Sequence, residues 1–494
     1  MEEERVFTLD DAIESLGFGR FQCLILVYAG MSWMAEAMEM MLLSFVGPAV
    51  EQLWDLSPRQ ESTISSVVFA GMMIGAYSWG VLSDSKGRRI GFFATAVITF
   101  IAGFLSSFAP NYYALLFLRA LVGIGLGGGP VVSSWFMEFV PAPNRGTLMV
   151  IFSVFWTLGS ILEAILAWTI MPRLGWRWLL GVSSTPLLFL LIFYPLVPES
   201  PRYYAAKGDT ASALAILKKM AAANKLELPQ GRFVCSGDKH DEEGVELEAT
   251  QLLCEKTPTP GSNAVIAVKD PPIQFFSKFA VLFSPPLLRS TILLWLVFFA
   301  NAFTYYGLVL LASQLSSQQT RCKLASPARK NSPLLHSGDS KDPVFRDVLI
   351  TSCAELPGLM IAAAMVDYYG RKVSMAVLFI FCGLFLSPLV SPQPEGVTTF
   401  LLFGARACIM GSFTILYVYA PEVYPTSSRT TGLGTANSFA RIGGILCPLV
   451  AVALVRTCHH SLAIMLFTLV SAMAAALIFS FPIETKGRAL TDVV

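Results

Sequence analysis

Long apolar stretches separated by short polar ones are the main pattern along this chain. A helix that crosses a bilayer needs about 20 mainly apolar residues, because its backbone polar groups must be satisfied within the helix. Twelve stretches meet this requirement: residues 23–49, 61–82, 90–109, 112–137, 147–170, 177–197, 287–312, 345–366, 373–391, 397–420, 431–456 and 461–481. The pattern therefore predicts an all-α membrane protein with twelve transmembrane helices.

The polar segments define the rest of the organisation. Residues 8–16 have the pattern of a short amphipathic helix that Thr8 caps and Gly17 ends. The polar stretch between the sixth and seventh spans contains a predicted helix at 210–226. A Pro-, Gly- and acid-rich part up to about residue 272 follows, which we expect to be disordered. We interpret this stretch as a linker, and the alternative is a merely solvated loop.

Five parts follow from this division. They are an amphipathic N-terminal segment (1–22), a first six-helix half (23–197), a linker (198–286), a second six-helix half (287–482) and a tail (483–494).

Composition agrees with a membrane protein. Of the 494 residues, 54% are apolar and only 14% are charged, whereas soluble domains carry roughly 25% charged residues. The net charge is +1, so no basic surface indicates nucleic acid as a partner. The twelve spans leave no room for a catalytic domain, and we expect no enzyme activity, no metal site and no cofactor.

Loop charges indicate the orientation. Short loops on one side carry seven basic residues and those on the other side carry four. Basic loops favour the cytoplasm, so both termini are expected there. The longer loop 313–344 opposes this assignment, because it carries five basic residues on the predicted outer side and Arg346 follows it. Cys322 and Cys458 both fall in predicted outer loops, where a disulfide between them is one possibility.

Charged motifs recur in the two halves at separations of 283 to 287 residues. Asp84 to Arg89 follows the second span, and Asp367 to Lys372 follows the eighth. The other matching pairs are Arg119 with Arg406, Glu138 with Glu422, Arg145 with Arg429, and Pro198-Glu199 with Pro482-Ile483-Glu484. Such regular spacing indicates a duplicated six-helix unit.

These motifs resemble those of the major facilitator superfamily. Gly80-x-x-x-Asp84-x-x-Gly87-Arg88-Arg89 is similar to its loop motif, and Arg119-x-x-x-Gly123-x-Gly125 is similar to its span-four motif. The second copy of the loop motif departs by carrying Ala363 where glycine is usual. The resemblance implies two pseudo-symmetric halves with a substrate site near the midplane between them.

Charges at the helix ends suggest a gate. We expect a clasp at the cytoplasmic ends that holds the outward-open state and breaks when the halves rock; the alternative is that each charge only anchors a helix end. The candidate gating residues are Asp84, Arg88, Arg119, Glu138, Arg145, Asp367, Arg371, Arg406, Glu422 and Arg429.

Two sequence patterns bear on nucleotide binding. Gly123 to Gly128 matches the dinucleotide pattern GxGxxG, but no strand precedes it and it lies inside a span, where small residues let helices approach closely. The phosphate-binding pattern GxxxxGK[ST] is absent from the sequence. We therefore expect secondary transport that is not driven by ATP.

Ionisable residues inside spans are functional candidates, because burying them costs several kcal/mol. Seven occur: Glu36, Glu39, Arg119, Glu163, Glu355, Arg406 and Arg441. The carboxylates Glu36, Glu39, Glu163 and Glu355 are candidates for proton coupling, since no histidine lies in a span. Arg441 presents a fork suited to a carboxylate ligand. The alternative is mutual neutralisation, for example of Glu355 by Arg406 or Arg441.

Aromatic and amide groups complete the expected site. With the charged residues, the candidate substrate-binding residues are Glu36, Glu39, Trp156, Asn301, Tyr305, Tyr306, Tyr417, Asn437 and Arg441. Aromatic faces suit a flat ring or a quaternary ammonium. No glutamine lies in the interior of a predicted span, which argues against a sugar.

Further motifs resemble one branch of the superfamily. They are Ala35 to Ser44, Trp176 to Leu180, Asn301 to Gly307 and Tyr419 to Pro425. They look like the branch of synaptic-vesicle-protein-related carriers, NiaP-type nicotinate transporters and plant organic cation/carnitine transporters. The resemblance implies uptake of nicotinate, trigonelline, carnitine or organic cations. We expect this transport to be proton-coupled and to be carried out by a monomer in the plasma membrane rather than the vacuolar membrane. The alternatives are a sugar or polyol porter and a non-transporting membrane sensor or vesicle protein.

Overall fold

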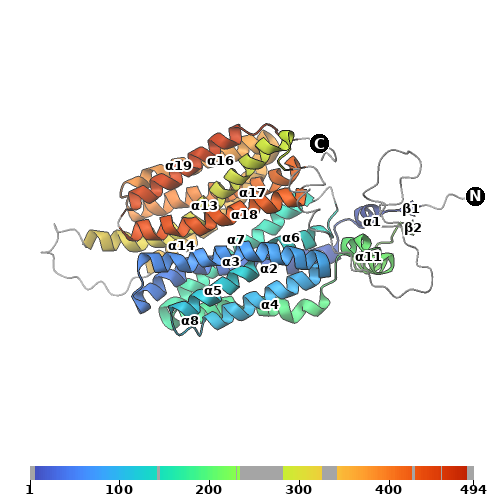
Figure 1. Ribbon diagram of the computed structural model, residues 1–494, viewed down its shortest axis with the longest axis horizontal. Coiled ribbons are helices and arrows are strands. Elements are labelled where there is room, and N and C mark those ends of the chain that lie inside the picture. Colours follow the sequence, from blue (N-terminus) through green and yellow to red (C-terminus); the bar gives the residue numbers. More distant parts are fainter. Residues whose placement is uncertain are drawn as a thin grey trace, which may run out of the picture.

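The protein is a bundle of long, nearly parallel helices with a small group of elements at one end (Figure 1). The computed structural model describes residues 6–141, 145–229, 231–233, 282–324, 342–424, 429–457 and 459–486. Within these ranges, twelve helical segments are long and apolar enough to cross a membrane. Each coincides with one of the twelve predicted spans to within about five residues, so the predicted membrane architecture is confirmed.

The first half contains six spans. They are built from α2 (Arg20–Trp54), α3 (Pro58–Lys86), α4 (Arg88–Ser106), α5 (Tyr112–Leu126) with α6 (Gly129–Met137), α7 (Arg145–Leu174), and α8 (Trp176–Ser183) with α9 (Thr185–Phe193) and η2 (Tyr194–Leu196).

The second half contains the other six. They are built from α13 (Pro285–Leu324), α14 (Asp342–Cys353) with α15 (Glu355–Tyr369), α16 (Arg371–Leu386) with η5 (Ser387–Val390), α17 (Glu395–Val423), α18 (Arg429–Pro448) with the π-helical η6 (Leu449–Leu454), and α19 (His460–Phe479).

A small cluster of elements extends beyond one end of the bundle (Figure 1). It contains α1 (Leu9–Leu16), α10 (Pro201–Ala206), α11 (Thr210–Asn224) and two short parallel strands, β1 (Val6–Phe7) and β2 (Arg232–Phe233). The predicted amphipathic helix is confirmed, because Thr8 caps α1 and Gly17 ends it. The predicted helix at 210–226 is confirmed as α11.

We call the end of the bundle that carries α1 and α11 the linker end, and the other the opposite end. The stretch expected to be disordered lies largely outside the described residues, as do Cys458 and the side chain of Cys322.

Glycines allow the helices of the first half to touch backbone to backbone. A Cβ at Gly75 of α3 would lie 2.0 Å from the Ile124 carbonyl oxygen, and one at Gly123 of α5 would lie 2.1 Å from the Val68 carbonyl oxygen. No L side chain fits such gaps. The GxGxxG stretch is therefore a helix-packing surface, as the sequence predicted.

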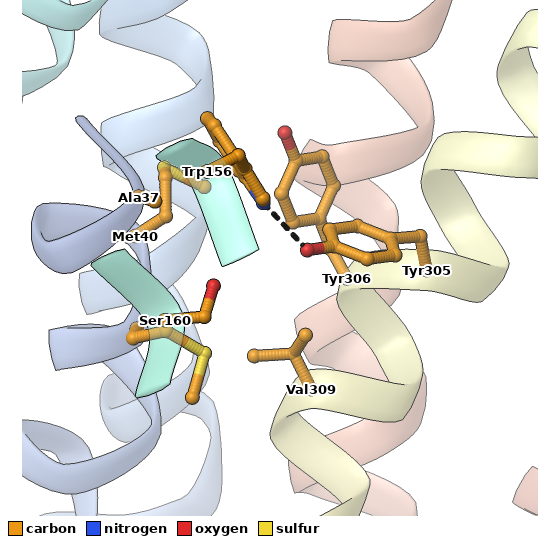
Figure 2. Close-up of a pocket in the computed structure, with 8 residues that line it drawn as sticks. Ala37, Met40, Trp156, Ser160, Tyr305, Tyr306 and Val309 are labelled. Atoms are coloured by element: carbon orange, nitrogen blue, oxygen red, sulfur yellow. Dashed lines mark hydrogen bonds between the residues drawn. The ribbon is translucent and has the colours of Figure 1, made fainter. Parts of the chain in front are cut away.

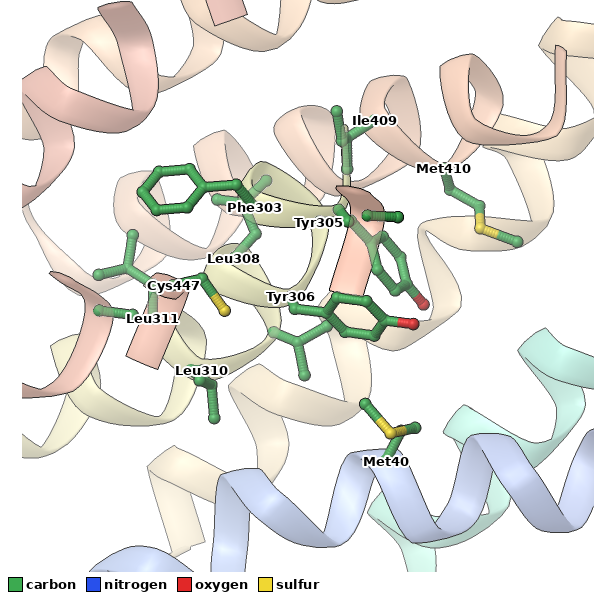
Figure 3. Packing of buried hydrophobic residues seen from close by; sticks show 14 of the residues in the cluster. Met40, Phe303, Tyr305, Tyr306, Leu308, Leu310, Leu311, Ile409, Met410 and Cys447 are labelled. Carbon is green, nitrogen blue, oxygen red and sulfur yellow. The ribbon is translucent and has the colours of Figure 1, made fainter. Parts of the chain in front are cut away.

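The halves meet along α2 and α7 of the first half and α13, α14 and α18 of the second, with α3 against α18. Their contact is a continuous core of aliphatic, aromatic and methionine side chains, part of which Figure 3 shows around Tyr305 and Tyr306. In Figure 3, Met40 of α2 points towards this cluster from the first half.

Candidate functional site

A small cavity lies between the two halves (Figure 2). Its lining side chains come from α2, α7 and α13: Ala37, Met40, Met41, Trp156, Ser160, Tyr305, Tyr306 and Val309. Its free volume is about that of one water molecule. A larger solute therefore requires the halves to separate here.

A hydrogen bond crosses between the halves beside this cavity. The Trp156 indole N–H donates to the Tyr305 hydroxyl at 2.7 Å, and Tyr305 donates onward to Glu355 at 2.8 Å (Figure 2 shows the first of these). Two predicted substrate-binding residues thus bind each other in this state. Their contact links the first half to a buried carboxylate of the second.

The two symmetry-related arginines of spans four and ten are both neutralised. Arg119 donates to Glu39 at 3.0 Å, and Arg406 donates to Glu355 at 2.9 Å; all four side chains are at most 1% exposed. The structure therefore contains the ion pair between Glu355 and Arg406 that the sequence analysis gave as an alternative. The two carboxylates are not symmetry-related, because Glu39 lies on the first span and Glu355 on the eighth.

Glu163 is the third deeply buried carboxylate, with no exposed surface. Both of its oxygens lie within 3.0 Å of the Ser183 hydroxyl, which donates the hydrogen bond. Among the described residues it forms no ion pair, and Glu39 is close enough to act on it electrostatically. A carboxyl group with only a hydroxyl partner is suited to carrying a proton.

Glu36 and Arg441 face the contact between the halves without pairing. Glu36 of α2 is 9% exposed, and in the described part of the chain no hydrogen bond or ion pair satisfies its carboxylate. Arg441 of α18 is half-buried, lies beside Tyr306 and acts on Glu36 electrostatically across the interface. Two opposite charges thus lie on opposite halves and remain available to a ligand.

Other predicted site residues divide into two groups. Tyr417 donates a hydrogen bond to the Asn437 amide oxygen, and Tyr417 is close enough to Arg441 for the two side chains to interact electrostatically. Asn301, by contrast, is fully buried between α13 and α17, where its amide nitrogen lies 3.4 Å from the Ser412 hydroxyl. The structure therefore brings Tyr417 and Asn437 to the Arg441 region and leaves Asn301 inside the second half.

Span four is broken beside Glu36. Helix α5 ends at Leu126 and α6 begins at Gly129. A Cβ at Gly129 would lie 2.8 Å from the Glu36 carboxylate and 3.0 Å from the Trp33 ring. Glycine at this point therefore leaves the space that the carboxylate and the indole occupy.

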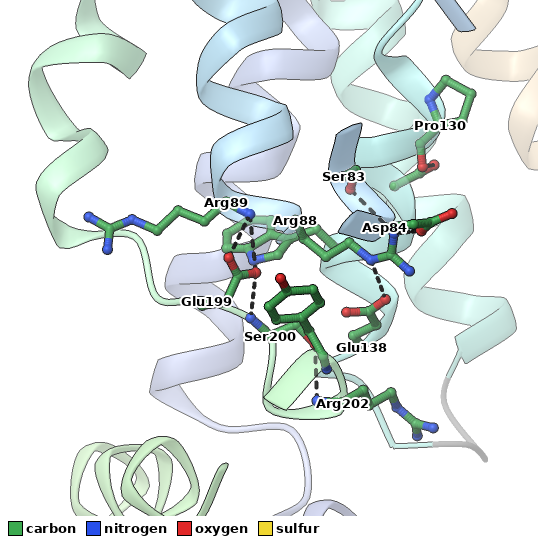
Figure 4. Close-up of polar contacts among 12 residues, drawn as sticks. Ser83, Asp84, Arg88, Arg89, Pro130, Glu138, Glu199, Ser200 and Arg202 are labelled. Carbon is green, nitrogen blue, oxygen red and sulfur yellow. Dashed lines mark hydrogen bonds and ion pairs between the residues drawn. The ribbon is translucent and has the colours of Figure 1, made fainter. Parts of the chain in front are cut away.

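At the linker end, the repeated motifs form equivalent contacts inside each half. Arg88 pairs with Asp84 and with Glu138 at 3.1 Å (Figure 4), and Arg371 pairs with Glu422 at 3.1 Å. The side chains of three other predicted gating residues, Arg145, Asp367 and Arg429, lie outside the described residues.

The repeated Pro-Glu motifs have a role that sequence reasoning missed. Glu199 accepts hydrogen bonds from the Arg89 backbone N–H at the start of α4 (Figure 4), and Glu484 accepts them from Arg371 and Lys372 at the start of α16. Gly87 and Gly370 precede these helices with φ of +113° and +88°. The equal spacing of these motifs in the sequence was the signal, because a repeated carboxylate near a repeated helix start predicts a cap.

Comparison with known proteins places this architecture in a family. The family model described as "Sugar (and other) transporter" matches residues 50–257 and 341–493. The organic cation/carnitine transporter 7 of Arabidopsis thaliana is 55% identical over 99% of this chain and 96% of its own. The synaptic vesicle 2-related protein of Xenopus laevis is 36% identical over 98% of this chain and 82% of its own.

The chain belongs to the sugar (and other) transporter family. It is a major facilitator transporter, and its relatives are transporters rather than enzymes. The fold also matches the partially occluded inward-open xylose transporter XylE of E. coli, with a TM-score of 0.70 and 17% identity over 95% of this chain and all of that one.

This transporter has one charged contact that the sequence interpretation did not contain. Arg456 is the last residue of the predicted span 431–456; its side chain is 5% exposed and pairs with Glu61 and Glu51 at the opposite end. Gln314 donates to Glu61 from a position just beyond the predicted seventh span. A buried glutamine therefore does lie near the end of a span, and the argument against a sugar weakens at that point.

Proposed function

We propose that the protein is a secondary active transporter of small nitrogen compounds that carry a carboxylate, or of organic cations, of the nicotinate, trigonelline and carnitine class. Transport would proceed by alternating access and would be coupled to protons. The name of the Arabidopsis relative, with 55% identity, supports the organic cation and carnitine part of this proposal.

One observation carries the substrate class: in the described part of the chain neither Glu36 nor Arg441 forms an ion pair, and the half-buried Arg441 contacts the Tyr306 hydroxyl. Glu39 and Glu355 bind arginines, and Glu163 binds a hydroxyl. A buried charge without a partner is costly, and a ligand of opposite charge lowers that cost. A molecule with a cationic nitrogen and a carboxylate satisfies Glu36 and Arg441 together.

Aromatic rings support the cationic end of such a ligand. Trp33 packs against Trp156 with 5.1 Å between ring centroids, and Trp33 also borders Glu36. An indole face attracts an ammonium or pyridinium group. At the other end, the Arg441 fork with the hydroxyl of Tyr306 offers several donors to a carboxylate.

Proton coupling would use carboxylates. Among the candidates Glu36, Glu39, Glu163 and Glu355, we favour Glu36 and Glu163, because the other two form buried ion pairs with arginines. Glu36 would exchange a proton for the substrate cation. The neighbourhood of Glu163, Glu39 and Arg119 in the first half offers a second place for a proton.

The orientation follows from loop charge. We propose that the linker end faces the cytoplasm and that the monomer works in the plasma membrane. The contacts between the halves then close the outer side in this state, and the ion pairs of the repeated loop motifs belong to a gate on the inner side.

A sugar or polyol porter is the alternative that a specific observation favours. The matching family includes sugar transporters, and the XylE fold is similar. Competition between sugars, such as xylose or a hexose, and nicotinate or carnitine for uptake distinguishes a sugar porter from the proposed transporter. A non-transporting sensor would bind ligand without moving it in liposomes.

The test is Arg441→Ala in proteoliposomes that receive radiolabelled carnitine, nicotinate, tetraethylammonium and xylose. A charge-assisted hydrogen bond contributes about 1.5–3 kcal/mol, so carboxylate uptake at limiting substrate should fall about 10- to 150-fold. Uptake of tetraethylammonium should change much less, because it has no carboxylate.

Arg173→Ala is the matched control, since Arg173 is an exposed arginine at the opposite end. Equal losses for carboxylate and purely cationic substrates in Arg441→Ala would refute the role of Arg441. Efficient xylose uptake with no carnitine or nicotinate uptake would refute the substrate class.

A further inference from the structure

Among the described residues, side-chain ion pairs connect the two halves at one end of the bundle only. At the opposite end, Arg456 of the second half donates to Glu61 at 3.1 Å and to Glu51 at 3.4 Å in the first half. At the linker end, Arg88 and Arg371 pair with carboxylates of their own half.

The contact around Arg456 connects three helices and the end of a fourth. Arg456 follows η6, Glu51 lies near the end of α2, and Glu61 lies in the first turn of α3. Gln314 of α13 donates to the same Glu61 oxygen at 3.0 Å. One carboxylate of the first half therefore binds two side chains of the second.

Most of the contact is shielded from water, while the Glu51 side chain keeps 22% of its surface exposed. Glu61 and Gln314 are 2% exposed, and the Arg456 side chain is 5% exposed. Deeper along α3, the Ser66 hydroxyl donates to the Ile445 backbone carbonyl at 2.8 Å, again from one half to the other. A passage at this end therefore opens only when these bonds break.

We propose that Arg456, Glu51 and Glu61 form a latch that closes the opposite end of the transporter and breaks in each transport cycle, with Gln314 holding Glu61 in place. Arginine suits this role because its planar fork binds two carboxylates at once. In the closed state the ions satisfy one another, and in the open state water hydrates them. The latch can therefore break without leaving a charge buried and alone.

The test measures access to a cysteine behind the latch. Ser66→Cys places a thiol at the contact with Ile445, and its labelling by a bulky hydrophilic maleimide is followed in nanodiscs. The parent without Ser66→Cys gives the background from native cysteines. Arg456→Gln should raise the labelling rate at least about tenfold, because the guanidinium that binds Glu51 and Glu61 is gone.

A matched control uses an arginine at the same end that stays within one half. Arg177 of α8 donates to the Ala109 carbonyl and stacks on Trp176. Arg177→Gln should leave the labelling of Ser66→Cys unchanged.

A second variant guards against misfolding. Glu51→Gln with Glu61→Gln removes the other side of the latch and should raise labelling in the same way. Folded protein whose labelling is unchanged in both variants would overturn the latch. The assay requires no substrate, so its outcome is independent of the proposed substrate class.

Discussion

Glu36 and Glu39 lie one helical turn apart on α2, yet they occupy different electrostatic surroundings. Glu39 is 1% exposed and binds Arg119, whereas Glu36 is 9% exposed and borders Trp33 and the contact between the halves. A buried ion pair joins Glu39 of α2 to Arg119 of α5. Glu36 has no such constraint and is free to exchange partners during a transport cycle.

Glu36→Gln tests whether Glu36 exchanges partners during transport. Glutamine has the size of glutamate but cannot ionise, so it removes both the proton site and the anion. We expect uptake to lose its pH dependence, so that uptake at pH 5.5 and uptake at pH 7.5 become nearly equal. Uptake of cationic substrates at limiting concentration should fall about tenfold, the loss expected for one charge-assisted hydrogen bond.

Two comparisons make the result specific. Glu395→Gln changes an exposed glutamate in the first turn of α17 and should keep the wild-type pH ratio. An unchanged pH response in folded Glu36→Gln would clear Glu36 of coupling and would leave Glu163 as the remaining candidate.

The sequence identified these charged residues but not their partners. Glu36 and Glu39 share a helix face, and nothing in their spacing says which one reaches Arg119. Arg456 was missed for a related reason: it sits at the end of an apolar run, and its ligands lie about 400 residues earlier, in the other half. Pairing between distant helices depends on packing that local patterns do not contain.

At the scale of elements, the apolar runs predicted the spans well and their interruptions poorly. The run 112–137 is apolar throughout, but its helix breaks between α5 and α6. Pro130 cannot donate a hydrogen bond to the preceding turn, and a Cβ at Gly128 would lie 2.2 Å from the Thr95 side chain. Pro130 and the glycines before it are the sequence signals of the break, which the apolar pattern alone does not reveal.

The linker helix α11 is tied to the start of the first span by one side chain. Asn224 accepts a hydrogen bond from the Phe21 backbone N–H at 2.9 Å and donates to Gln22 at 2.8 Å and to the Leu16 carbonyl at 3.3 Å. Gly19 lies against it, where a Cβ would be 2.3 Å away. The short helix α1 is thereby held on α11.

Asn224→Ala should release α11. The variant loses three hydrogen bonds, each contributing about 0.5–1.5 kcal/mol, so the local opening of α11 becomes more frequent. Trypsin should cleave several-fold faster after Lys218, Lys219 and Lys225, as measured by mass spectrometry of timed digests.

Gly19→Ala acts on the same contact from the other side and should have the same effect, because its methyl group displaces the Asn224 amide. Asn111→Ala is the control, since Asn111 caps α5 at the opposite end by accepting from Ala114. Cleavage in the linker at the wild-type rate in both Asn224→Ala and Gly19→Ala would show that this side chain does not anchor α11.

At the scale of the whole molecule, the halves share their linker-end motifs and differ at the opposite end. Glu199 and Glu484 cap equivalent helices, and Arg88 and Arg371 bind equivalent carboxylates. The sequence predicted this symmetry because duplicated motifs keep their spacing. The latch of Arg456 belongs to no repeated motif, so the repeat could not reveal it.

The predicted clasp and the latch should therefore have opposite effects: the clasp favours the state that is open at the opposite end, and the latch favours the state that is closed there. The clasp is expected to hold the state in which the opposite end is open, and Asp84 is one of its predicted residues. In the present state, with the opposite end closed, Asp84 pairs with Arg88 of its own half. Asp84→Lys places a cation beside that arginine and should weaken the clasp. In the Ser66→Cys, Arg456→Gln background, it should lower the labelling rate by several-fold, back towards the value seen with an intact latch.

The control for charge alone is Asp10→Lys, which makes the same substitution at the linker end, where Asp10 pairs with Arg202. It should leave labelling unchanged, because α1 and α10 both belong to the first half and its linker. If Asp84→Lys also left labelling unchanged, the loop-motif charges would only anchor helix ends. If it raised labelling, the motif would hold the closed state, and the two ends of the transporter would not oppose each other.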